Sequence, residues 1–466
     1  MSLLHAHPRK TPKLKTGQIC LCAAMILALA ACVSTEKPGN ASPVRSLVIL
    51  HTNDFHARTL PDKSGRGGAA NMAAFIKSVR QRRCDILVLD AGDMTQGSPV
   101  STIYKGEPIF EIYNEIGYDA ATLGNHEFDC GIGMIDRYRA IADFPILTAN
   151  LERKGRPIGD APAKVFTVNG VRIAVIGLTT HQAIYQKDLT ILRPEEALGR
   201  YLPQLREKAD LIVVLSHLGV ERDRELAASV PEIDLIVGGH SHTVIPTPET
   251  VGRTLIVQAG EHGKNVGELT LEVDTESDRI VSSQGRLVAI PVEGLAPDPD
   301  TDRLVQSWEA RVKATVDVKI GVNAKAQSIP ELTRAIGLIW KNAYGTDFGL
   351  QNSGGTRARL EAGDILVRDI YNILPFDNTI TILQLTRAQA AEEIDGAQFA
   401  ENKELYSVAT NSYQADRLIE KYQIPEARIR RLPDPHRDAV IAFVKKHGHL
   451  DLARIESPAV ARARAD

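Results

Sequence analysis

Residues 235–242 read LIVGGHSH, a hydrophobic run that ends in two histidines. Three other hydrophobic runs, at 48–50, 86–89 and 211–215, are likewise followed within a few residues by Asp or His. Because side chains at the carboxyl ends of neighbouring strands converge on one edge of a sheet, we expect these residues to meet. Buried carboxylates and imidazoles are costly unless they are paired or bind a metal, so the pattern predicts a metal site.

Seven side chains in and near these segments offer the donor atoms that divalent metals bind: Asp54, His56, Asp93, Asn125, His217, His240 and His242. Asp54 and His56 are two residues apart, which places both on one side of an extended segment, and His240 and His242 have the same spacing. Asp93 follows a glycine, so its carboxylate can reach out and bridge two cations. The set predicts two divalent ions, Zn, Mn or similar, and hydrolysis of a phosphoester by a water that the metals activate.

His126 lies beside Asn125 and is not needed as a ligand. Asp129, three residues further on, is placed to orient the His126 ring and to keep it charged. We expect this pair to stabilise charge on the phosphate or to protonate the leaving oxygen. Glu127 is expected to hold the loop or to support the ligands. Each short motif alone could be a surface pair, a turn or a histidine at a strand end, and it is their conjunction that indicates a site.

The first 31 residues have the features of a secretory signal peptide. Arg9, Lys10, Lys13 and Lys15 form a basic start, and an apolar run follows over residues 19–31. Residues 29–32, LAAC, resemble a bacterial lipobox, which implies cleavage before Cys32 and lipid attachment to its thiol; an ordinary signal peptide is the alternative. Residues 32–45 are expected to be a flexible tether. The predicted location is extracytoplasmic, in the periplasm or at the cell surface, anchored to a bacterial membrane.

Composition indicates which partners to expect. The 466 residues give room for two domains, and removal of residues 1–31 leaves 51 basic against 58 acidic residues. No basic and aromatic cluster stands out, so we expect a small-molecule substrate, no polymeric nucleic acid and no protein partner. Cys84 and Cys130 are expected at opposite edges of a sheet, too far apart for a disulfide.

Strand and helix signals alternate up to about residue 275, which predicts mixed sheets with helices outside them. Strands are expected over 46–50, 86–90, 254–258 and 269–273, helices over 69–80, 107–116 and 132–141, and a hairpin around Asn169-Gly170. The prolines at 297 and 299 mark a boundary. A connecting helix over 302–316 and a second α/β unit over about 321–452 are expected to follow.

The motifs together resemble the bacterial and animal 5′-nucleotidase family of calcineurin-like metallophosphoesterases. They are LHTNDFH (50–56), DAGD (90–93), TLGNHEFD (122–129), SH (216–217) and GHSH (239–242). The resemblance implies an α/β fold with a four-layer metallophosphoesterase β-sandwich flanked by helices over 46–300. A linker helix over 301–320 and a smaller α/β substrate-binding domain over 321–455 would follow.

The resemblance also implies how the ligands are shared. One metal would be held by Asp54, His56, Asp93 and His242, and the other by Asp93, Asn125, His217 and His240. The catalytic pair would be His126 and Asp129.

The second half resembles the same family at QNSGGTR (351–357), LPFDN (374–378) and ATNSY (409–413). This implies that Asn352 and Arg357 contact the substrate base and phosphate, and that Phe376 and Tyr413 stack on the base. Without the resemblance, core packing would be the preferred interpretation of both rings. This half departs from the family pattern in a short segment between Leu385 and Tyr406, in the lack of a GGDG run after Tyr413, and in a missing Arg before the 336–344 helix.

The implied reaction is hydrolysis of nucleoside 5′-monophosphates to nucleoside and phosphate. The departures in the second half leave other enzymatic functions open. These are hydrolysis of 2′,3′-cyclic nucleotides or of UDP-sugars by an altered base pocket, and a sulfur-ester hydrolase. A non-catalytic, ligand-binding lipoprotein is the alternative from another functional class.

Overall fold

The computed structural model describes residues 43–181, 184, 188–400 and 403–456. The predicted signal peptide, the lipidation at Cys32 and most of the predicted tether lie outside the described residues. The chain divides into two units, residues 1–44 and 45–466, and the fold below is that of the second. Within the described part of the chain, no helix combines the length and the apolar character needed to cross a bilayer.

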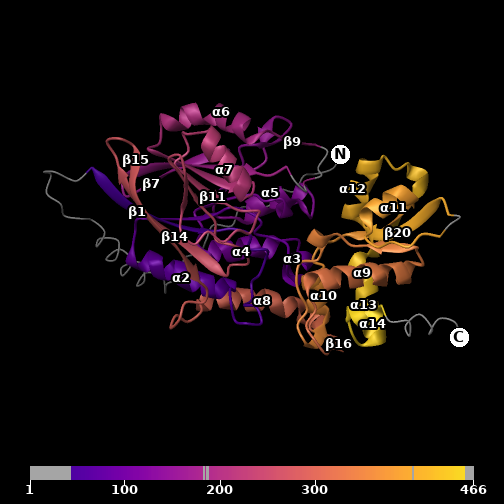
Figure 1. The fold of residues 1–466 in the computed structure, drawn as a ribbon. Helices are drawn as coiled ribbons and strands as arrows, with labels where there is room; N and C mark the ends of the chain where they lie inside the picture. Colours follow the sequence, from indigo (N-terminus) through magenta and orange to yellow (C-terminus); the bar gives the residue numbers. More distant parts are fainter. Residues whose placement is uncertain (1–42, 182–183, 185–187, 401–402, 457–466) are drawn as a thin grey trace, which may run out of the picture. The chain divides into compact units, whose positions relative to one another are not determined.

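Two six-stranded sheets form the N-terminal part (Figure 1). The first has, in spatial order, β15 (Arg279–Ala289), β14 (Asn265–Asp274), β1 (Val44–Thr52), β2 (Ile86–Asp90), β3 (Ala120–Thr122) and β4 (Ile146–Leu147). The second has β12 (Glu249–Val251), β13 (Thr254–Val257), β11 (Leu235–Gly238), β10 (Leu211–His217), β8 (Val171–Thr179) and β7 (Ala163–Val168). Strands β1 to β4 are parallel, as are β8, β10, β11 and β13, so their carboxyl ends share one edge in each sheet.

Alternation along the strands explains why the sheets pack face to face. In β1, Leu47 and Ile49 enter the core between the sheets, whereas Val48 and Leu50 pack on the opposite face. Strand β10 alternates in the same way, with Val213 in the core between the sheets. Because successive side chains point to opposite faces, a strand that is apolar throughout is buried on both sides.

Helices cover the outer faces and complete a four-layer α/β sandwich (Figure 1). Against the first sheet lie α2 (Ala69–Arg82), α4 (Glu107–Ile116), η2 (His126–Phe128) and α5 (Gly133–Ile141), and against the second α6 (Pro194–Arg206) and α7 (Val220–Ser229). The short α3 (Pro99–Ile103) instead packs through Val100 on Trp308 and Val312. A small sheet is formed by β6 (Arg156–Pro157), β5 (Leu151–Arg153) and β9 (Leu189–Ile191). We call β1 to β15 with these helices the sandwich.

The C-terminal part, from β16 (Lys319–Asn323) onward, also combines helices and strands, and it has its own apolar cores. Its four-stranded sheet has β17 (Phe348–Leu350), β20 (Leu405–Asn411), β19 (Thr379–Thr386) and β21 (Ile429–Pro435), and β16 pairs with β18 (Gly363–Leu366). Its helical segments are α9 (Ile329–Tyr344), η3 (Ser353–Gly355), α10 (Val367–Ile373), α11 (Arg387–Glu393), α12 (Ser412–Tyr422), η4 (Glu426–Arg428), α13 (His436–His447) and α14 (Leu452–Ile455).

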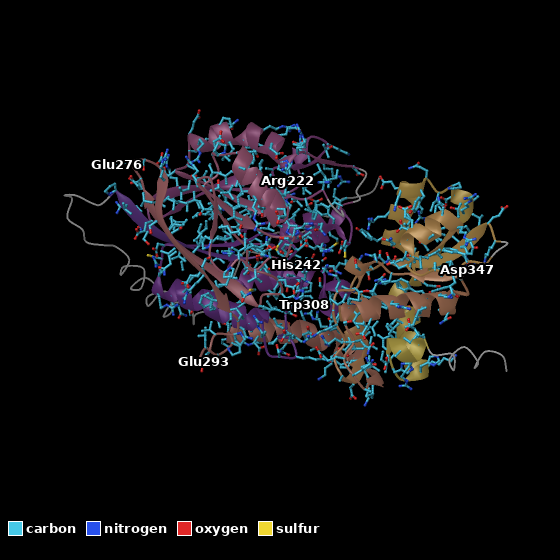
Figure 2. The ribbon with its side chains drawn as sticks, in the orientation of Figure 1. Arg222, His242, Glu276, Glu293, Trp308 and Asp347 are labelled. Carbon is cyan, nitrogen blue, oxygen red and sulfur yellow. The ribbon has the colours of Figure 1, made fainter. Side chains whose placement is uncertain are left out.

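Helix α8 (Pro299–Val316) leads from the sandwich to the C-terminal part. It begins at Pro299, three residues before the predicted start, because the Asp298 side chain accepts a hydrogen bond from the Thr301 N–H and caps the helix. Trp308, labelled in Figure 2, packs edge-on against Tyr104 of the sandwich with ring centroids 4.9 Å apart.

The predicted fold class is confirmed. The hairpin at Asn169-Gly170 joins β7 and β8, and both turn residues have the positive φ that such a turn requires. The helices predicted over 69–80 and 107–116 are α2 and α4. Cys84 and Cys130 are free, in agreement with the expected absence of a disulfide between them.

Candidate metal centre and active site

The predicted ligands come from the carboxyl ends of strands in both sheets. The first sheet contributes Asp54 and His56 after β1, Asp93 after β2 and Asn125 after β3; the second contributes His217 at the end of β10 and His240 and His242 after β11. Six of these, together with His126, form three groups, and within each group the donor atoms lie within 4.8 Å of one another. Asn125 is adjacent to His126 in the sequence. The site therefore spans the carboxyl-terminal edges of two sheets.

The expected reason for the convergence of Asp54 and His56 was wrong. Both residues have left-handed backbones, with φ of 50°, instead of lying on an extended segment. His240 and His242 depart from extended geometry in the same way, with φ of 71° and 55°. Non-glycine residues held at positive φ cost free energy and concentrate at functional sites, where the surrounding structure fixes them. Tight turns, and not strand alternation, bring these pairs together.

Asp93 is at the centre of the cluster. Its Oδ2 lies 3.1 Å from Nε2 of His217, and 3.9 Å from Nε2 of both His56 and His126. Its other oxygen accepts the backbone N–H of His126 at 2.9 Å. Burial opposes ionisation of Asp93, but the surrounding histidines hold its pKa well below the usual range. One carboxylate oxygen thus faces donor atoms from three separate segments of the chain.

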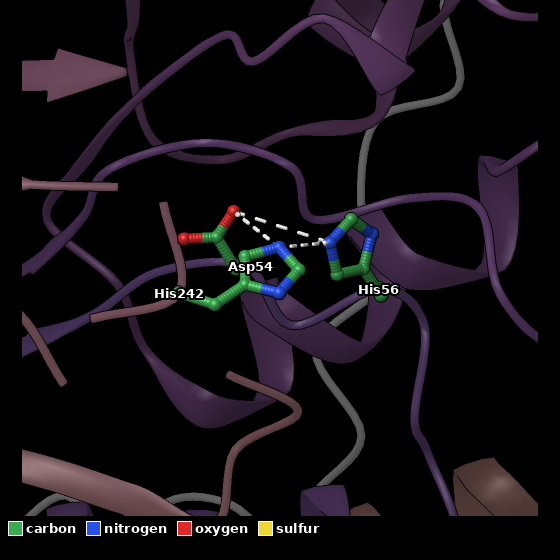
Figure 3. Close-up of side chains that lie close together, drawn as sticks. All are labelled: Asp54, His56 and His242. Carbon is green, nitrogen blue, oxygen red and sulfur yellow. Dashed lines mark hydrogen bonds and ion pairs between the residues drawn. The ribbon is translucent and has the colours of Figure 1, made fainter. Parts of the chain in front are cut away.

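Asp54, His56 and His242 form a second group (Figure 3). Nε2 of His242 lies 3.3 Å from Oδ1 of Asp54 and 3.1 Å from Nε2 of His56. The Asp54 carboxylate also accepts the backbone N–H of His240 at 3.0 Å. Two imidazole nitrogens and a carboxylate oxygen thus face one another, which is a donor set that divalent cations bind.

Partners of Nδ1 orient the rings of His217 and His242, so that Nε2 of each ring faces the cluster. Nδ1 of His217 donates to the carbonyl of Ala91 at 2.7 Å, and since a carbonyl only accepts, Nδ1 carries the hydrogen. Nε2 of a neutral His217 is then left with a lone pair directed at Asp93. Nδ1 of His242 lies 2.8 Å from the Glu261 carboxylate, which leaves Nε2 free toward Asp54. Such partners fix the tautomer of metal-binding histidines.

His126 and Asp129 lie together as the sequence predicted. Nδ1 of His126 is 2.8 Å from Oδ2 of Asp129. Burial lowers the pKa of His126, but the carboxylates of Asp129 and Asp93 outweigh this effect and raise it. The His126 ring therefore favours the charged form, with its Nε2 turned toward Asp93.

Two of the predicted substrate residues lie against this cluster. Nη2 of Arg357 is 3.1 Å from Nε2 of His56, and the Phe376 ring is 5.5 Å from the His126 ring, centroid to centroid. Asn352 instead accepts a hydrogen bond from Nδ2 of Asn411 at 2.8 Å. Tyr413 is at the start of α12 and is half-buried. The structure thus brings Arg357 and Phe376 to the ligands, and holds Asn352 within its own network.

Comparisons with known proteins agree with this geometry. Residues 47–244 match the calcineurin-like phosphoesterase family, and residues 314–398 match the 5′-nucleotidase C-terminal domain. The 5′-nucleotidase of Bos taurus is 30% identical, over 73% of this chain and 69% of that protein. The chain belongs to the 5′-nucleotidase family.

Further members of the 5′-nucleotidase family support the assignment. The 5′-nucleotidase of Vibrio cholerae is 29% identical over 82% of each chain. The crystal structure of a 5′-nucleotidase precursor from Thermus thermophilus aligns with a TM-score of 0.78 at 25% identity, covering 87% of this chain and 97% of that one. This member of the family is a phosphoesterase, and the predicted enzyme class is confirmed.

Glu127 holds the loop, as the sequence predicted for it. Its buried carboxylate accepts the backbone N–H groups of Gly124 at 2.6 Å, Thr95 at 2.9 Å and Asp93 at 3.1 Å. It thereby ties the loop after β2 to the loop after β3. Glu261 was missed altogether, although its position just after β13, next to His262, resembles that of the predicted ligands.

Proposed function

We propose that this protein hydrolyses nucleoside 5′-monophosphates to nucleoside and inorganic phosphate, with two divalent metal ions as cofactors. The observation that carries the proposal is the placement of Arg357 and Phe376, from the C-terminal part, against His56 and His126 of the sandwich. An arginine suited to phosphate and an aromatic face suited to a base thus adjoin a cluster of metal-type ligands.

The residues fit the proposed metals. Within the described part of the chain, Oδ1 of Asn125, Nδ1 of His56 and Nε2 of His217 are buried and make no hydrogen bond. Buried polar atoms of this kind need a partner, and a cation supplies one for the amide oxygen and for Nε2 of His217. The carboxylate, amide and imidazole donors admit Zn, Mn and related ions. When bound, such ions polarise phosphoryl oxygens and make water a nucleophile at neutral pH.

We assign the ligands as the family resemblance implies. One ion would be held by Asp54, His56, Asp93 and His242, and the other by Asp93, Asn125, His217 and His240. The shared Asp93 is supported by the distances from its Oδ2 to the surrounding histidines.

The protein's own groups would bind the substrate and move the proton. The Arg357 guanidinium donates to the phosphate oxygens, and the face of Phe376 stacks on the base, with Asn352 and Tyr413 completing the base site. His126, held through Nδ1 by Asp129, presents Nε2 to the phosphate and donates a proton to the leaving oxygen. The leaving group departs as the nucleoside alcohol.

A substrate panel tests the proposal. The soluble form beginning near Ser46 would be given Mn or Zn, and phosphate release would be measured for AMP, GMP, UMP, a 2′,3′-cyclic nucleotide, a UDP-sugar and p-nitrophenyl phosphate. We expect the 5′-monophosphates to be the best substrates. Bound metal with no turnover of any of them would favour the ligand-binding lipoprotein.

One observation supports a second candidate, the hydrolysis of cyclic nucleotides or UDP-sugars. Strands β19 and β20 are paired up to Thr386 and Leu405, so only residues 387–404 connect the two strands. The described residues of this connection contain one short helix, α11, and no strand. A small base-binding region would leave room for a larger or cyclic substrate, and a preference for these esters in the same panel would establish this function.

We also propose that the mature protein is a lipoprotein outside the cytoplasm, anchored through Cys32 to a bacterial membrane. The LAAC motif after a basic start and an apolar run supports this location. Expression with labelled palmitate tests it: label should enter the wild-type chain and should be absent from Cys32→Ser. Equal labelling of both chains would contradict the anchor.

A further inference from the structure

The Gln258 side chain, just after strand β13, makes three hydrogen bonds to one loop. Its Nε2 donates to the carbonyl of Gly239 at 3.2 Å, and its Oε1 accepts from Oγ of Ser241 at 3.0 Å and from the N–H of Thr243. Gln258 is completely buried, and it is not among the predicted site residues. A carboxamide carries both donors and an acceptor, so this one side chain holds the loop at three separate points.

The loop that Gln258 holds carries two of the proposed metal ligands. The bonded residues, at positions 239, 241 and 243, alternate with His240 and His242, so each histidine lies between two of them. Both histidines have positive φ, and a residue other than glycine keeps that conformation only where the surrounding structure imposes it. The three hydrogen bonds from Gln258 supply such a constraint on both sides of each histidine.

The backbone at Gly239 packs against two further proposed ligands. A Cβ atom on Gly239 would lie 2.9 Å from Nδ1 of His217, in the second sheet, and 3.3 Å from Oδ2 of Asp54, which follows a strand of the first sheet. Interiors packed this closely transmit small displacements to their neighbours. The hydrogen bond from Gln258 to the Gly239 carbonyl therefore acts at a point where the ligands of both sheets meet.

Helix α7 contacts the same loop at Ser241. The N–H of Val220, the first residue of α7, donates to Oγ of Ser241 at 3.1 Å. Because the Ser241 hydroxyl donates its hydrogen to Gln258, its oxygen is left to accept the Val220 N–H. Ser241 thus joins the start of the helix, the ligand loop and Gln258 in one network.

We infer that Gln258 is a positioning residue that places His240 and His242 for the two proposed ions. It acts through the loop, because its hydrogen bonds go to the residues beside and between these two ligands. Groups that fix the orientation of metal ligands change the metal affinity when they are removed. This inference rests on the proposed function and deepens it, since it assigns a buried amide a role in the binding of both ions.

Metal titration of Gln258→Met tests the inference, because methionine keeps the side-chain length and makes none of the three hydrogen bonds. The protein, freed of metal by a chelator, would be titrated with Co²⁺, whose visible absorption reports the arrangement of its ligands. We expect the dissociation constants of both ions to rise about 10-fold to 100-fold, and the absorption of the loaded variant to differ from that of wild type. A glutamine that served stability alone would lower the unfolding midpoint of the metal-free protein and change neither metal measurement.

Thr254→Val is the matched control from the opposite end of β13. The Thr254 side chain is also completely buried, and its hydroxyl donates to the carbonyl of Ile233 at 2.7 Å. Its loss should lower the unfolding midpoint of the metal-free protein and leave both dissociation constants unchanged. Ser241→Ala, at an exposed position, removes only one of the three Gln258 hydrogen bonds and should raise the constants about 2-fold to 10-fold, so it serves as the test if Gln258→Met does not fold.

Wild-type dissociation constants and absorption in Gln258→Met would overturn the inference while the proposed function stands. Wild-type constants in Ser241→Ala would do the same if Gln258→Met does not fold. A rise in the constants of Thr254→Val as large as that of Gln258→Met would also overturn it, since the effect would then follow stability and not position. A wild-type protein that binds no Co²⁺ would reject the proposed two-metal function, and the inference with it.

Discussion

The proposed ligand loops of the sandwich and the proposed substrate loops of the C-terminal part hold their polar groups in different ways. In the ligand loops, buried atoms of Asn125 and His217 are left without hydrogen bonds. In the C-terminal part, Asn352 accepts a hydrogen bond from Asn411, whose Nδ2 also bonds to Gln351 at 2.7 Å. A cation would satisfy the atoms of the first region, whereas Asn352 in the second is satisfied within the protein.

The loop that carries Phe376 shows how the second region is fixed. Nη1 of Arg437 donates to the carbonyl of Phe376 at 2.6 Å, and Nε2 of His436 donates to the same oxygen at 2.9 Å. The Arg437 guanidinium also pairs with Asp377 and lies over the Tyr371 ring. The comparison teaches that the proposed ligand site would be completed by a cofactor, whereas the proposed substrate face is held by its own packing.

Substitution of Asp93, the central residue of the proposed ligand cluster, should have the largest effect on metal binding and activity. Asp93→Asn removes the charge that faces three histidines, so we expect loss of bound metal and a fall in kcat/KM of about 10,000-fold or more. Metal analysis of the purified protein and phosphate release would measure both. Asp85→Asn, a matched change just before β2 at the opposite end of that strand, should retain the metal. Retained metal and activity in Asp93→Asn would remove Asp93 from the centre of the site.

Loss of His126 should separate catalysis from metal binding. We expect His126→Ala to lower kcat about 100-fold to 10,000-fold through loss of the proton donor, with metal content unchanged. Asp129→Asn should have a smaller effect of the same kind, since the ring remains. If metal content fell in parallel with kcat, His126 would be a ligand, as its place in a group with His56 and Asp93 allows.

Acid should destabilise the C-terminal part through His436. This side chain is fully buried, and burial lowers its pKa to about 3 in the folded state. Unfolded histidine titrates near 6.5, so as the pH falls below 6.5 only the unfolded state gains the proton. The free energy of unfolding should then lose about 2 kcal/mol at pH 5, with no contribution above pH 7.

Fluorescence of Trp340, which donates its indole N–H to the carbonyl of His436, can follow unfolding at each pH. His436→Gln has no titrating ring, so its stability should change less between pH 7 and pH 5 than that of wild type. Identical pH slopes for the two proteins would refute this assignment.

The smallest effect is expected at the stacking face. Phe376→Leu should raise KM for a nucleoside monophosphate about 10-fold, because a base loses its aromatic partner. Turnover of p-nitrophenyl phosphate and metal content should stay the same. A comparable loss on p-nitrophenyl phosphate would show that Phe376 acts by packing on His126 and not by holding a base.

The sequence predicted the grouping of the ligands well because the underlying rule is local. A strand followed by Asp, His or Asn places the side chain at the sheet edge, wherever that strand lies in the chain. The left-handed backbones of Asp54 and His242 could not be predicted, because neighbouring loops impose them against the preference of the residue. The sequence therefore predicted which side chains come together, but not the backbone geometry that directs them.

The roles of residues that act through partners far along the chain could not be predicted from the sequence. Glu261 supports His242, and Arg437 holds the Phe376 loop. No spacing along the chain encodes these pairs, since each depends on the packing of the whole fold. Cys84 and Cys130 show the converse: strand direction alone predicted that they would not form a disulfide, and both are free.

The origin of the ligands in both sheets has a consequence for how the protein matures. Asp54, Asp93 and Asn125 belong to one sheet, and His217, His240 and His242 to the other, so a cation bound by both sets is a cross-link between them. A cross-link of this kind closes long loops of chain and favours the folded state in proportion to the logarithm of metal concentration. Metal supply would then set how long the finished molecule survives proteolysis, as well as how fast it works.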